Sequence, residues 1–120
     1  MEDWEVAPGR IRETTGVDAE TIAFSKAYLS TNQDVPVCDD VFFRVDTIYS
    51  GNSLQLEADP DKTRICSLAA GKVRVKIGDQ PEFIVGPHGM FKVKAGVTCT
   101  IRNRMYLDAV VHTTVLQGFT

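Results

Sequence analysis

The chain has 120 residues, of which 43% are hydrophobic and 24% charged, with 13 Lys and Arg against 16 Asp and Glu. This length suits one domain with a single core, and the composition excludes disordered, collagen-like and mucin-like chains. The net charge of -3 argues against an electrostatic grip on nucleic acid over the whole surface but is compatible with a local basic patch.

In chain order, the first twenty residues are expected to form a turn and an extended arm, because Pro8, Gly9 and Gly16 interrupt any helical spacing of apolar residues. Short runs rich in β-branched and aromatic residues then recur, and these predict strands. The runs are 21–29, 41–50, 52–58, 63–71, 72–78, 81–85, 89–94, 97–103 and 105–116. A helix within 18–30, where Ala, Glu and Lys are mixed in, is the alternative for the first run.

Turn signals separate these runs. They stand at Ser50-Gly51, around Asp59-Pro60, and at Gly78-Asp79, Gly86-Pro87, Ala95-Gly96 and Asn103. Short strands at such regular spacing predict an all-β sandwich or barrel rather than alternating βαβ units. We therefore expect an arm over residues 1–20 and a barrel domain over residues 21–120.

The segment KVRVKI predicts a strand with one wet and one buried face, since Lys72, Arg74 and Lys76 alternate with Val and Ile. This basic row is expected to be a solvated surface. In 41–50 and 105–116, by contrast, both alternating sets are rich in apolar residues. A strand that is apolar on both faces needs a second covering layer, and a partner subunit would supply it.

Cysteine usage and the opening segment indicate the compartment. The three cysteines are widely spaced without a CxxC pair, so neither a disulfide framework nor a zinc knuckle is indicated. A reducing compartment, cytosol or nucleus, fits best. No apolar run approaches the roughly 20 residues of a membrane span, and MEDWEVAPGR is too acidic for a signal peptide. We expect a soluble protein without a membrane partner, cut from a longer chain.

The segment GPHGMFKVKAGVTCTIRN and the region from 51 to 71 resemble the two sequence motifs of the cupin superfamily. In the second motif, Gly96 and Asn103 match the family's second Gly and its Asn, Gly89 stands one position from the first Gly, and Lys94 replaces a Pro. In the first motif, the glycines at 51 and 71 match the two ends. The resemblance implies an all-β, cupin-type jelly-roll β-barrel.

The metal-ligand histidines of both motifs are replaced in this chain. Glu57 and Asp59 stand at the HxH pair of the family, Arg64 at its Glu, and Cys99 at its second-motif His. Cupin enzymes hold Fe, Mn, Ni or Zn with imidazole nitrogens and one carboxylate, whereas a guanidinium would repel a cation. The resemblance therefore implies a degenerate pocket made of these four residues, with no metal, no cofactor and no catalysis.

Other catalytic interpretations of the polar residues are weaker than structural ones. His88 in its Gly-Pro-His-Gly segment is expected in a surface turn, and His112 in a core or an interface. Cys99 is expected to be a buried packing thiol, because no base is evident beside it. Glu57 and Asp59, beside Pro60, are expected at a solvated strand end.

Within the superfamily, the chain resembles the C-terminal cupin domain of centromere protein C (CENP-C) in its fungal form. The resembling segments are WEVAPGRIR, IAFSKAYLS, VFFRVDTIYSG, TRICSLAAGKVRVKIGD and GMFKVKAGVTCTIRNRMYLDAVVHTTV. The resemblance implies a homodimerisation module in the nucleus, at the centromere and kinetochore, which pairs two copies of a scaffold. Contact with the centromeric nucleosome is expected only through regions outside this chain, because the family's Arg-rich nucleosome-binding motif is not recognisable here.

A symmetric dimer contact is the hypothesis for the apolar strands. It consists of Phe42, Phe43, Val45, Tyr49, Tyr106, Val110, Val111 and Leu116. Two alternatives remain. One is a small-molecule-binding or metal-dependent cupin that uses the degenerate pocket. The other is a peptide-docking module for a kinetochore or meiotic partner, which uses a sheet edge or the basic row.

Overall fold

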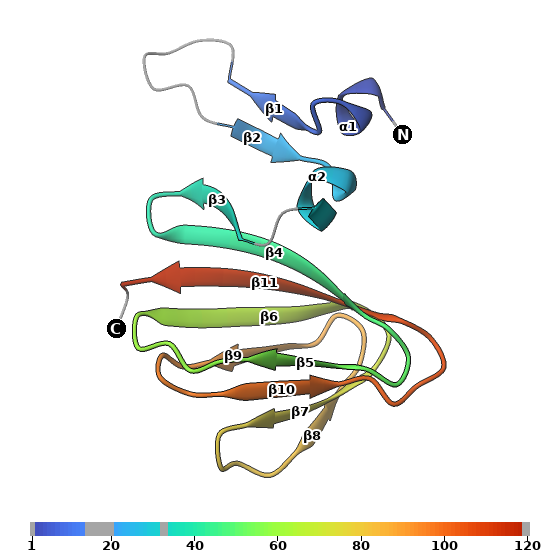
Figure 1. Ribbon diagram of the computed structural model, residues 1–120, viewed down its shortest axis with the longest axis vertical. Helices are drawn as coiled ribbons and strands as arrows, with labels where there is room; N and C mark the ends of the chain where they lie inside the picture. The colour runs from blue at the N-terminus through green and yellow to red at the C-terminus, as the bar shows by residue number, and fades with distance from the viewer. Residues whose placement is uncertain (1, 14–20, 32–33, 119–120) are drawn as a thin grey trace.

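Figure 1 shows the computed structural model, which describes residues 2–13, 21–31 and 34–118. Antiparallel strands dominate these ranges, and the two helices in them are short. The elements in chain order are α1 (Asp3–Val6), β1 (Arg10–Arg12), β2 (Thr21–Phe24), α2 (Lys26–Thr31), β3 (Val35–Cys38), β4 (Val41–Ile48), β5 (Ser53–Leu56), β6 (Lys62–Ala70), β7 (Val73–Ile77), β8 (Phe83–Val85), β9 (Met90–Val93), β10 (Cys99–Arg102) and β11 (Ala109–Gln117).

Two antiparallel sheets face each other and form a jelly roll. The larger has five strands in the order β3-β4-β11-β6-β9, and the smaller has four in the order β5-β10-β7-β8. A separate hairpin of β1 and β2 completes the described chain. The all-β jelly roll predicted from the sequence is confirmed, as are the turns at the Gly and Pro positions between the strands.

The core lies between the two sheets, because the inward residues of nearly every strand are apolar. Val73 and Val75 of β7 are buried, while Arg74 between them and Lys72 just before the strand are exposed, which confirms the predicted alternation. In β11, every second residue from Ala109 to Val115 is buried. The largest fully buried side chains include Leu68, Ile101, Val35, Val93 and Val111.

Residues 21–31 combine the two structures that the sequence left open. The strand β2 ends at Phe24, and α2 begins immediately after Ser25. Ser25 is buried, and its Oγ accepts a hydrogen bond from the backbone N–H of Tyr28 at 3.1 Å. A serine in this place satisfies a free N–H of the first helical turn, so the expected strand over 21–29 stops where a helix can be capped.

Further differences from the predicted elements lie in loops and in the arm. The arm contains the short helix α1, and Glu2 and Glu5 cap it reciprocally. Its strand β1 pairs with β2, so the hairpin continues past residue 20. The strand β3 was not predicted, and β11 begins at Ala109 rather than at 105. None of the helices in the described residues is long and apolar enough to cross a membrane.

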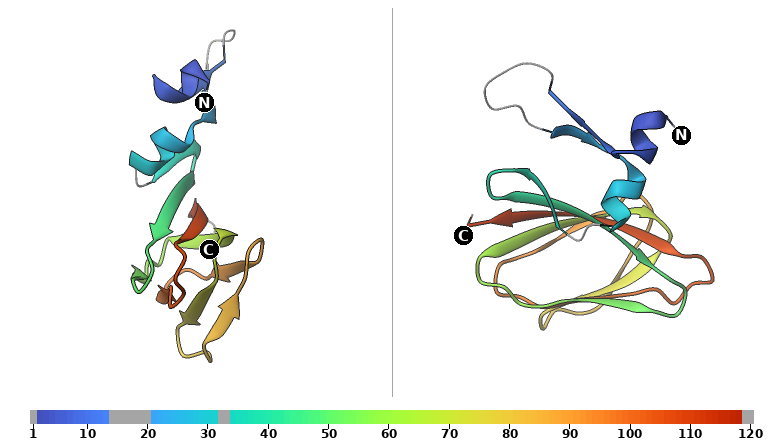
Figure 2. Two further views of the ribbon diagram at one scale, coloured as in Figure 1. Left: turned by 90° about the vertical axis from the view of Figure 1, so that its right-hand side faces the viewer. Right: turned by 45° about the horizontal axis from the view of Figure 1, so that its top comes forward.

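The molecule is flat and elongated, with principal extents of 49 × 35 × 20 Å. Both views in Figure 2 place the β1–β2 hairpin and α1 beyond the larger sheet, outside the barrel, whereas α2 lies against β4. The hairpin exposes Ile11 and Ile22, which are 36% and 64% accessible. The arm therefore adds surface to the molecule without adding to the barrel core.

Candidate functional site

The degenerate pocket divides into two inward-facing and two outer residues. Cys99 points from β10 into the core and is 1% exposed. Arg64 on β6 directs its guanidinium to the backbone carbonyl of Glu57, with Nη1 donating at 3.0 Å. The carboxylate side chain of Glu57 is exposed, whereas that of Asp59 accepts a hydrogen bond from the Asp61 N–H at 2.9 Å. Glu57 and Asp59 thus occupy the turn between β5 and β6, as expected of a strand end.

The two core thiols are held in their neutral form. Burial raises the pKa of Cys99 to about 12. Burial also raises the pKa of the Cys66 thiol, and a hydrogen bond from the Thr113 hydroxyl at 3.6 Å opposes this only in part. A nucleophilic or metal-binding cysteine acts as the thiolate. Neither thiol is therefore prepared for such chemistry near neutral pH, and Cys99 is the buried packing residue that the sequence predicts.

Alkylation will distinguish the two core thiols, those of Cys66 and Cys99, from the exposed thiol of Cys38 by their reactivity. At about pH 8, iodoacetamide will modify Cys38 and spare Cys66 and Cys99, because both lie below 2% exposure and stay protonated. Intact-mass spectrometry will show a single adduct in native protein and one on each cysteine after denaturation in guanidinium chloride. Rapid modification of Cys99 in the folded protein would contradict its assignment to the core.

The same pKa shift predicts a loss of stability in alkali. The folded pKa of Cys99 is about 12, whereas an unfolded cysteine titrates near 8.5, so the unfolded chain releases its proton first. The contribution of the protonated Cys99 thiol to the free energy of unfolding is therefore complete below about pH 8.5 and is lost as the pH rises toward 12. Urea unfolding at increasing pH will follow this decline, and the decline will be shallower for Cys99→Ala.

A polar cluster on the inner face of β4 was not anticipated from the sequence. Arg44 donates two hydrogen bonds to the carboxylate of Asp46, each at 2.8 Å, and its Nη1 lies 3.6 Å from Asp34. The hydrogen bond to Asp46 is the main cause that raises the pKa of Arg44. The signal in the sequence is the opposite charge at i and i+2 of one strand, which places both side chains on one face. The described residues contain no group of three or more His, Cys, Asp and Glu that could hold a metal ion.

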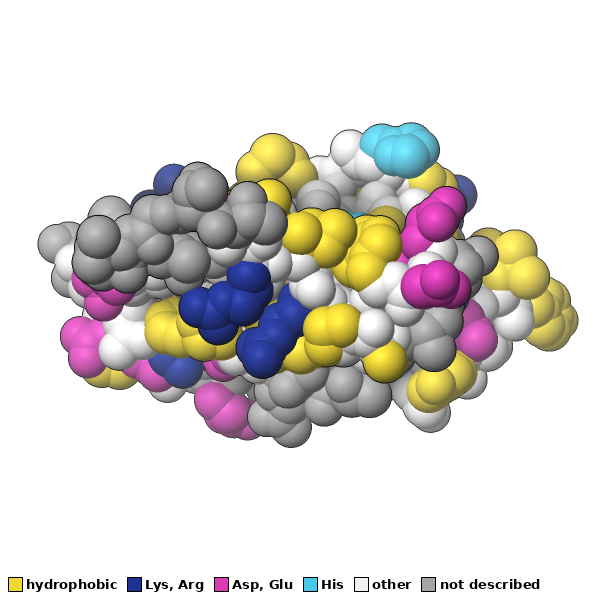
Figure 3. All heavy atoms as spheres, turned by 90° about the horizontal axis from the view of Figure 1, so that it is seen from above, with side chains coloured by type: hydrophobic (Ala, Val, Ile, Leu, Met, Phe, Trp, Pro, Cys, Tyr) yellow, Lys and Arg dark blue, Asp and Glu magenta, His cyan; other side chains and the backbone are white. Residues whose placement is uncertain are grey.

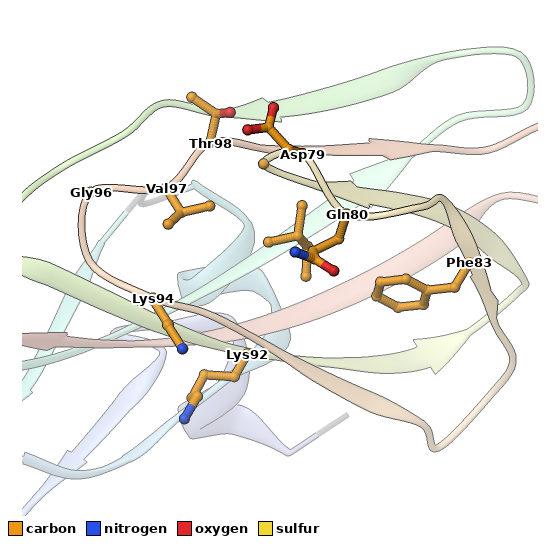
Figure 4. A pocket seen from close by; sticks show the side chains of 10 residues that line it. Asp79, Gln80, Phe83, Lys92, Lys94, Gly96, Val97 and Thr98 are labelled. Atoms are coloured by element: carbon orange, nitrogen blue, oxygen red, sulfur yellow. The ribbon is translucent and has the colours of Figure 1, made fainter.

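A cavity at one end of the smaller sheet lies outside the predicted pocket. It has a volume of about 660 Å³ and opens between the β7–β8 turn and the chain from β9 to β10. Figure 4 shows Lys92 and Lys94 on one side of it, with Gln80 and Phe83 on the other. None of the four degenerate-pocket residues lines it. The charged side chains that line it are those of Asp79, Lys92 and Lys94.

The outer face of the larger sheet is apolar where β4 and β11 pair. Val45 lies opposite His112 and Phe43 opposite Thr114, so all four point outward together. The rings of Phe43 and His112 pack edge to face at a centroid distance of 5.6 Å. Helix α2 borders this face, and a cavity of about 540 Å³ lies between them, lined by Lys26, Leu29, Val45, Thr47, Asp108, Val110 and His112. His112 thus lies on a half-buried surface, while His88 is in an exposed turn with φ of 70°.

The predicted interface set does not form one surface. Val111 is 0% exposed and points into the core, and Phe42 lies on the same inner face, opposite the buried Val115. These two assignments are corrected, because adjacent residues of a strand point to opposite faces. Tyr49 and Tyr106 lie in loops at one end of the barrel. The members that share the outer face are Phe43, Val45, Val110 and Leu116. We call these four residues, together with His112, the apolar outer face.

The loop from β10 to β11 presents large hydrophobic side chains to solvent. Met105, Tyr106 and Leu107 are 46%, 99% and 77% exposed. Figure 3 shows hydrophobic side chains protruding at the right-hand end of the molecule, where this loop lies in Figure 1. The Asp108 carboxylate accepts a hydrogen bond from the Ser50 N–H at 3.1 Å, which joins the loop to the turn after β4. Tyr49 and Tyr106 belong to this end surface and not to the apolar outer face.

The basic row is placed as the sequence predicts. Lys72 and Arg74 are exposed on the outer face of the smaller sheet, and Lys76 is half-buried beside them. The Lys76 ammonium donates to the backbone carbonyl of Gln80, and Arg74 lies 3.5 Å from Glu82. Sequence reasoning missed Arg102 on the neighbouring strand β10, which is in register with Arg74. The place of Arg102 beside the basic row follows from the pairing of β7 with β10, and a single sequence does not reveal which strands pair.

Comparison with known proteins identifies the fold. Neither a family model nor a curated protein sequence matches the chain. Among solved structures, the cupin domain of Schizosaccharomyces pombe Cnp3 is similar, with a TM-score of 0.73 and 13% identity over 90% of this chain and 85% of that chain. A conserved protein with a double-stranded β-helix domain from Klebsiella pneumoniae has a TM-score of 0.63 and 13% identity, over 75% of this chain and 82% of that chain.

An enzyme is among the structures that share the fold. Oxalate oxidase has a TM-score of 0.61 and 15% identity, over 66% of this chain and 43% of that chain. At such identities the comparisons show the fold, which is that of the cupins, also called the double-stranded β-helix. The fold alone serves enzymes and non-enzymes, so function must be argued from the surfaces and the interior.

Proposed function

We propose that this chain is a non-catalytic homodimerisation module of a centromere and kinetochore scaffold protein of the CENP-C type. Its likeness to the Cnp3 cupin domain over 90% of the chain supports the scaffold type. The segments of sequence that resemble the CENP-C family support the same assignment. The module would act in the nucleus, where it would pair two scaffold copies for centromeric chromatin binding and kinetochore assembly.

The apolar outer face carries the proposal that the module dimerises. A sheet with one solvated face alternates apolar and polar side chains, yet Phe43, Val45 and Val110 point away from the core. A second copy related by a two-fold axis would cover this face with the same residues, in an isologous contact. Because β4 and β11 are neighbours near the middle of the larger sheet, such a contact would join two sheets back to back.

Dimerisation alone gives such a module a function. Two copies of a scaffold carry every weak binding site twice, and the second site of a pair then binds at a high effective concentration. The gain in overall binding can reach about 10²- to 10⁴-fold without any new contact. No reaction at the barrel interior is needed for this.

Val110→Glu will convert the dimer to a monomer. Val110 is half-buried on the apolar outer face, and a carboxylate there would be desolvated beside its own symmetry mate. Size-exclusion chromatography with light scattering will give twice the protomer mass for the natural sequence and the protomer mass for the variant. Ile84→Glu is the matched control, because Ile84 is 55% exposed on the outer face of the other sheet. An unchanged dimer of Val110→Glu would refute this interface.

The residues at the cupin metal positions do not fit a catalytic ion. Arg64 brings a positive charge toward this part of the interior, and the Cys99 thiol is kept neutral by the burial that raises its pKa. The Glu57 side chain turns to solvent. We therefore propose that the alternative, a metal-dependent cupin enzyme, does not apply. Elemental analysis of protein purified without chelator tests this, and one equivalent of Fe, Mn, Ni or Zn per chain would overturn it.

A further inference from the structure

The outer face of the smaller sheet concentrates positive charge. Five of the 13 Lys and Arg residues of the chain lie there, although the chain as a whole has a net charge of -3. We call these five residues the basic face: Lys72, Arg74, Lys76, Arg102 and Arg104. Glu82, 3.5 Å from Arg74, is the acidic residue that contacts them within the described chain.

The register of the strands sets like charges against each other. Arg74 on β7 is directly opposite Arg102 on β10, and both are exposed. Like charges in this position oppose sheet pairing. No salt bridge joins Arg102 or Arg104 to an acidic residue in the described part of the chain. The arrangement therefore does not serve the fold, and an anion that lies across both strands would relieve the repulsion.

We propose that the basic face binds an extended acidic segment of a partner protein. Side chains at every second position of a strand are about 6.8 Å apart, so Lys72, Arg74 and Lys76 form a row with that repeat. An extended peptide has the same repeat, and its alternate carboxylates or phosphates therefore meet successive cations. Arg102 provides a second cation beside the middle of the row, where it can form a bidentate contact.

A small hollow at one end of the basic face supports a peptide as the occupant. Lys72, Arg74 and Arg104 surround it, together with the side chains of Ile84 and Met105. Its volume of about 50 Å³ accommodates one small group. Ile84 and Met105 are also 55% and 46% exposed, so the hollow offers both apolar contact and positive charge. A peptide side chain can use both features at once.

The same observations disfavour nucleic acid. Nonspecific binding of single strands uses aromatic side chains as stacking platforms, and the strands β5, β7, β8 and β10 direct no aromatic side chain to this face, since Phe83 pairs with Val75 on the inner side. The net charge of -3 would repel a long polyanion beyond the footprint of the face. A short acidic segment avoids that repulsion.

The proposed docking does not depend on the proposed dimer. The basic face belongs to the smaller sheet, whereas the apolar outer face belongs to the larger one. In a back-to-back dimer, the two basic faces would point away from each other. The monomeric Val110→Glu variant should therefore bind acidic peptide with the same affinity per chain, so a failed dimer and a failed docking site give different results.

Fluorescence anisotropy with labelled synthetic peptides tests the docking site. The first probe alternates Glu and Leu, the second alternates phosphoserine and Leu, and a Gln and Leu peptide is the neutral control. The full chain is expected to bind one or both acidic probes and to ignore the neutral one. Comparison of the two acidic probes shows whether carboxylates or phosphates are the better ligands.

Paired charge removal locates the site. Arg74→Gln with Arg102→Gln should weaken acidic-probe binding at least tenfold and should leave the melting temperature unchanged or higher. Lys92→Gln with Lys94→Gln removes the same charge beside the large cavity and should change affinity less than twofold. Equal losses in the two double variants, no binding of either acidic probe, or tighter binding of duplex DNA than of both probes at physiological salt would each overturn the proposal.

Discussion

Replacing Val111 by Glu will unfold the protein, although the same change at its neighbour Val110 will leave it folded. Val111 is 0% exposed and lies opposite Leu68 in the centre of the larger sheet. A carboxylate there would be buried directly opposite the Asp46 carboxylate, whose partner Arg44 is already bonded to it, and such a charge costs several kcal/mol or more. That cost is comparable to the roughly 5–15 kcal/mol by which a domain is stable.

Circular dichroism and urea unfolding will distinguish the two variants. Val111→Glu should lose its β signal or become insoluble, whereas Val110→Glu should unfold cooperatively near the natural midpoint. Val111→Ala is the graded control, since it removes apolar volume without adding charge and should cost about 1–3 kcal/mol. A soluble Val111→Glu with a native melting curve would mean that the faces of β11 are reversed.

This pair of variants also shows what the sequence could and could not predict. The run 105–116 is apolar at both alternating sets, so its period identifies a strand but not the side that faces the core. The structure resolves this through pairing, because β11 lies between β4 and β6 and its buried set faces the smaller sheet. The predicted interface mixed both faces for this reason. The strand KVRVKI was easier, since its charged residues mark the wet side directly.

The strand β4 gives a second example. In VFFRVDTI, Phe42, Arg44 and Asp46 point inward, while Phe43 and Val45 point outward. Hydropathy alone favours the opposite assignment, because the observed one places two charged side chains, those of Arg44 and Asp46, on the core side. The bidentate contact between Arg44 and Asp46 makes this tolerable, and both side chains remain about one fifth exposed. A paired charge near a sheet edge cannot be recognised before the pairing partner and the edge are known.

The fold itself was easier to predict than its surfaces. Strand lengths and Gly or Pro turns are local signals, and they located the strands from β4 to β11. The basic face, by contrast, joins residues 72–76 with Arg102 and Arg104, which become neighbours only when β10 pairs with β7. Surfaces made from separate strands depend on topology, and this is why the sequence indicated one row of cations rather than a face.

The second large effect is expected at Asn103, where a buried amide holds the end of the barrel together. Asn103 is 1% exposed, and its Nδ2 donates to the carbonyls of Ile48 at 2.8 Å and Leu107 at 2.9 Å. Its Oδ1 accepts from the Met105 N–H at 3.0 Å. One side chain thus joins the end of β4 to the loop before β11. It also explains why β11 begins at Ala109, since residues 105–107 are held in a loop.

Asn103→Ala should destabilise the protein by about 2–4 kcal/mol, because it leaves a buried carbonyl of Ile48 and two loop groups without their partner. For a domain of this size, we expect the melting temperature to fall by roughly 10 °C. Thr100→Ala is the control on β10, the strand that Asn103 follows, since Thr100 Oγ1 donates to Gln55 Oε1 at 2.8 Å on the exposed face. That loss should stay within about 0.5 kcal/mol, because water replaces the partner.

The Asn103 variant also tests whether the loop before β11 contributes to the dimer contact. The apolar outer face is built on β4 and β11, and Val110 follows the loop by only a few residues. If the loop hydrophobic residues at 105–107 contributed the contact, Asn103→Ala would release them and yield monomers at temperatures where the barrel is folded. We expect a dimer until the barrel melts, because Phe43 and Val45 lie on β4, outside that loop. A folded, monomeric Asn103→Ala would move the interface to the barrel end.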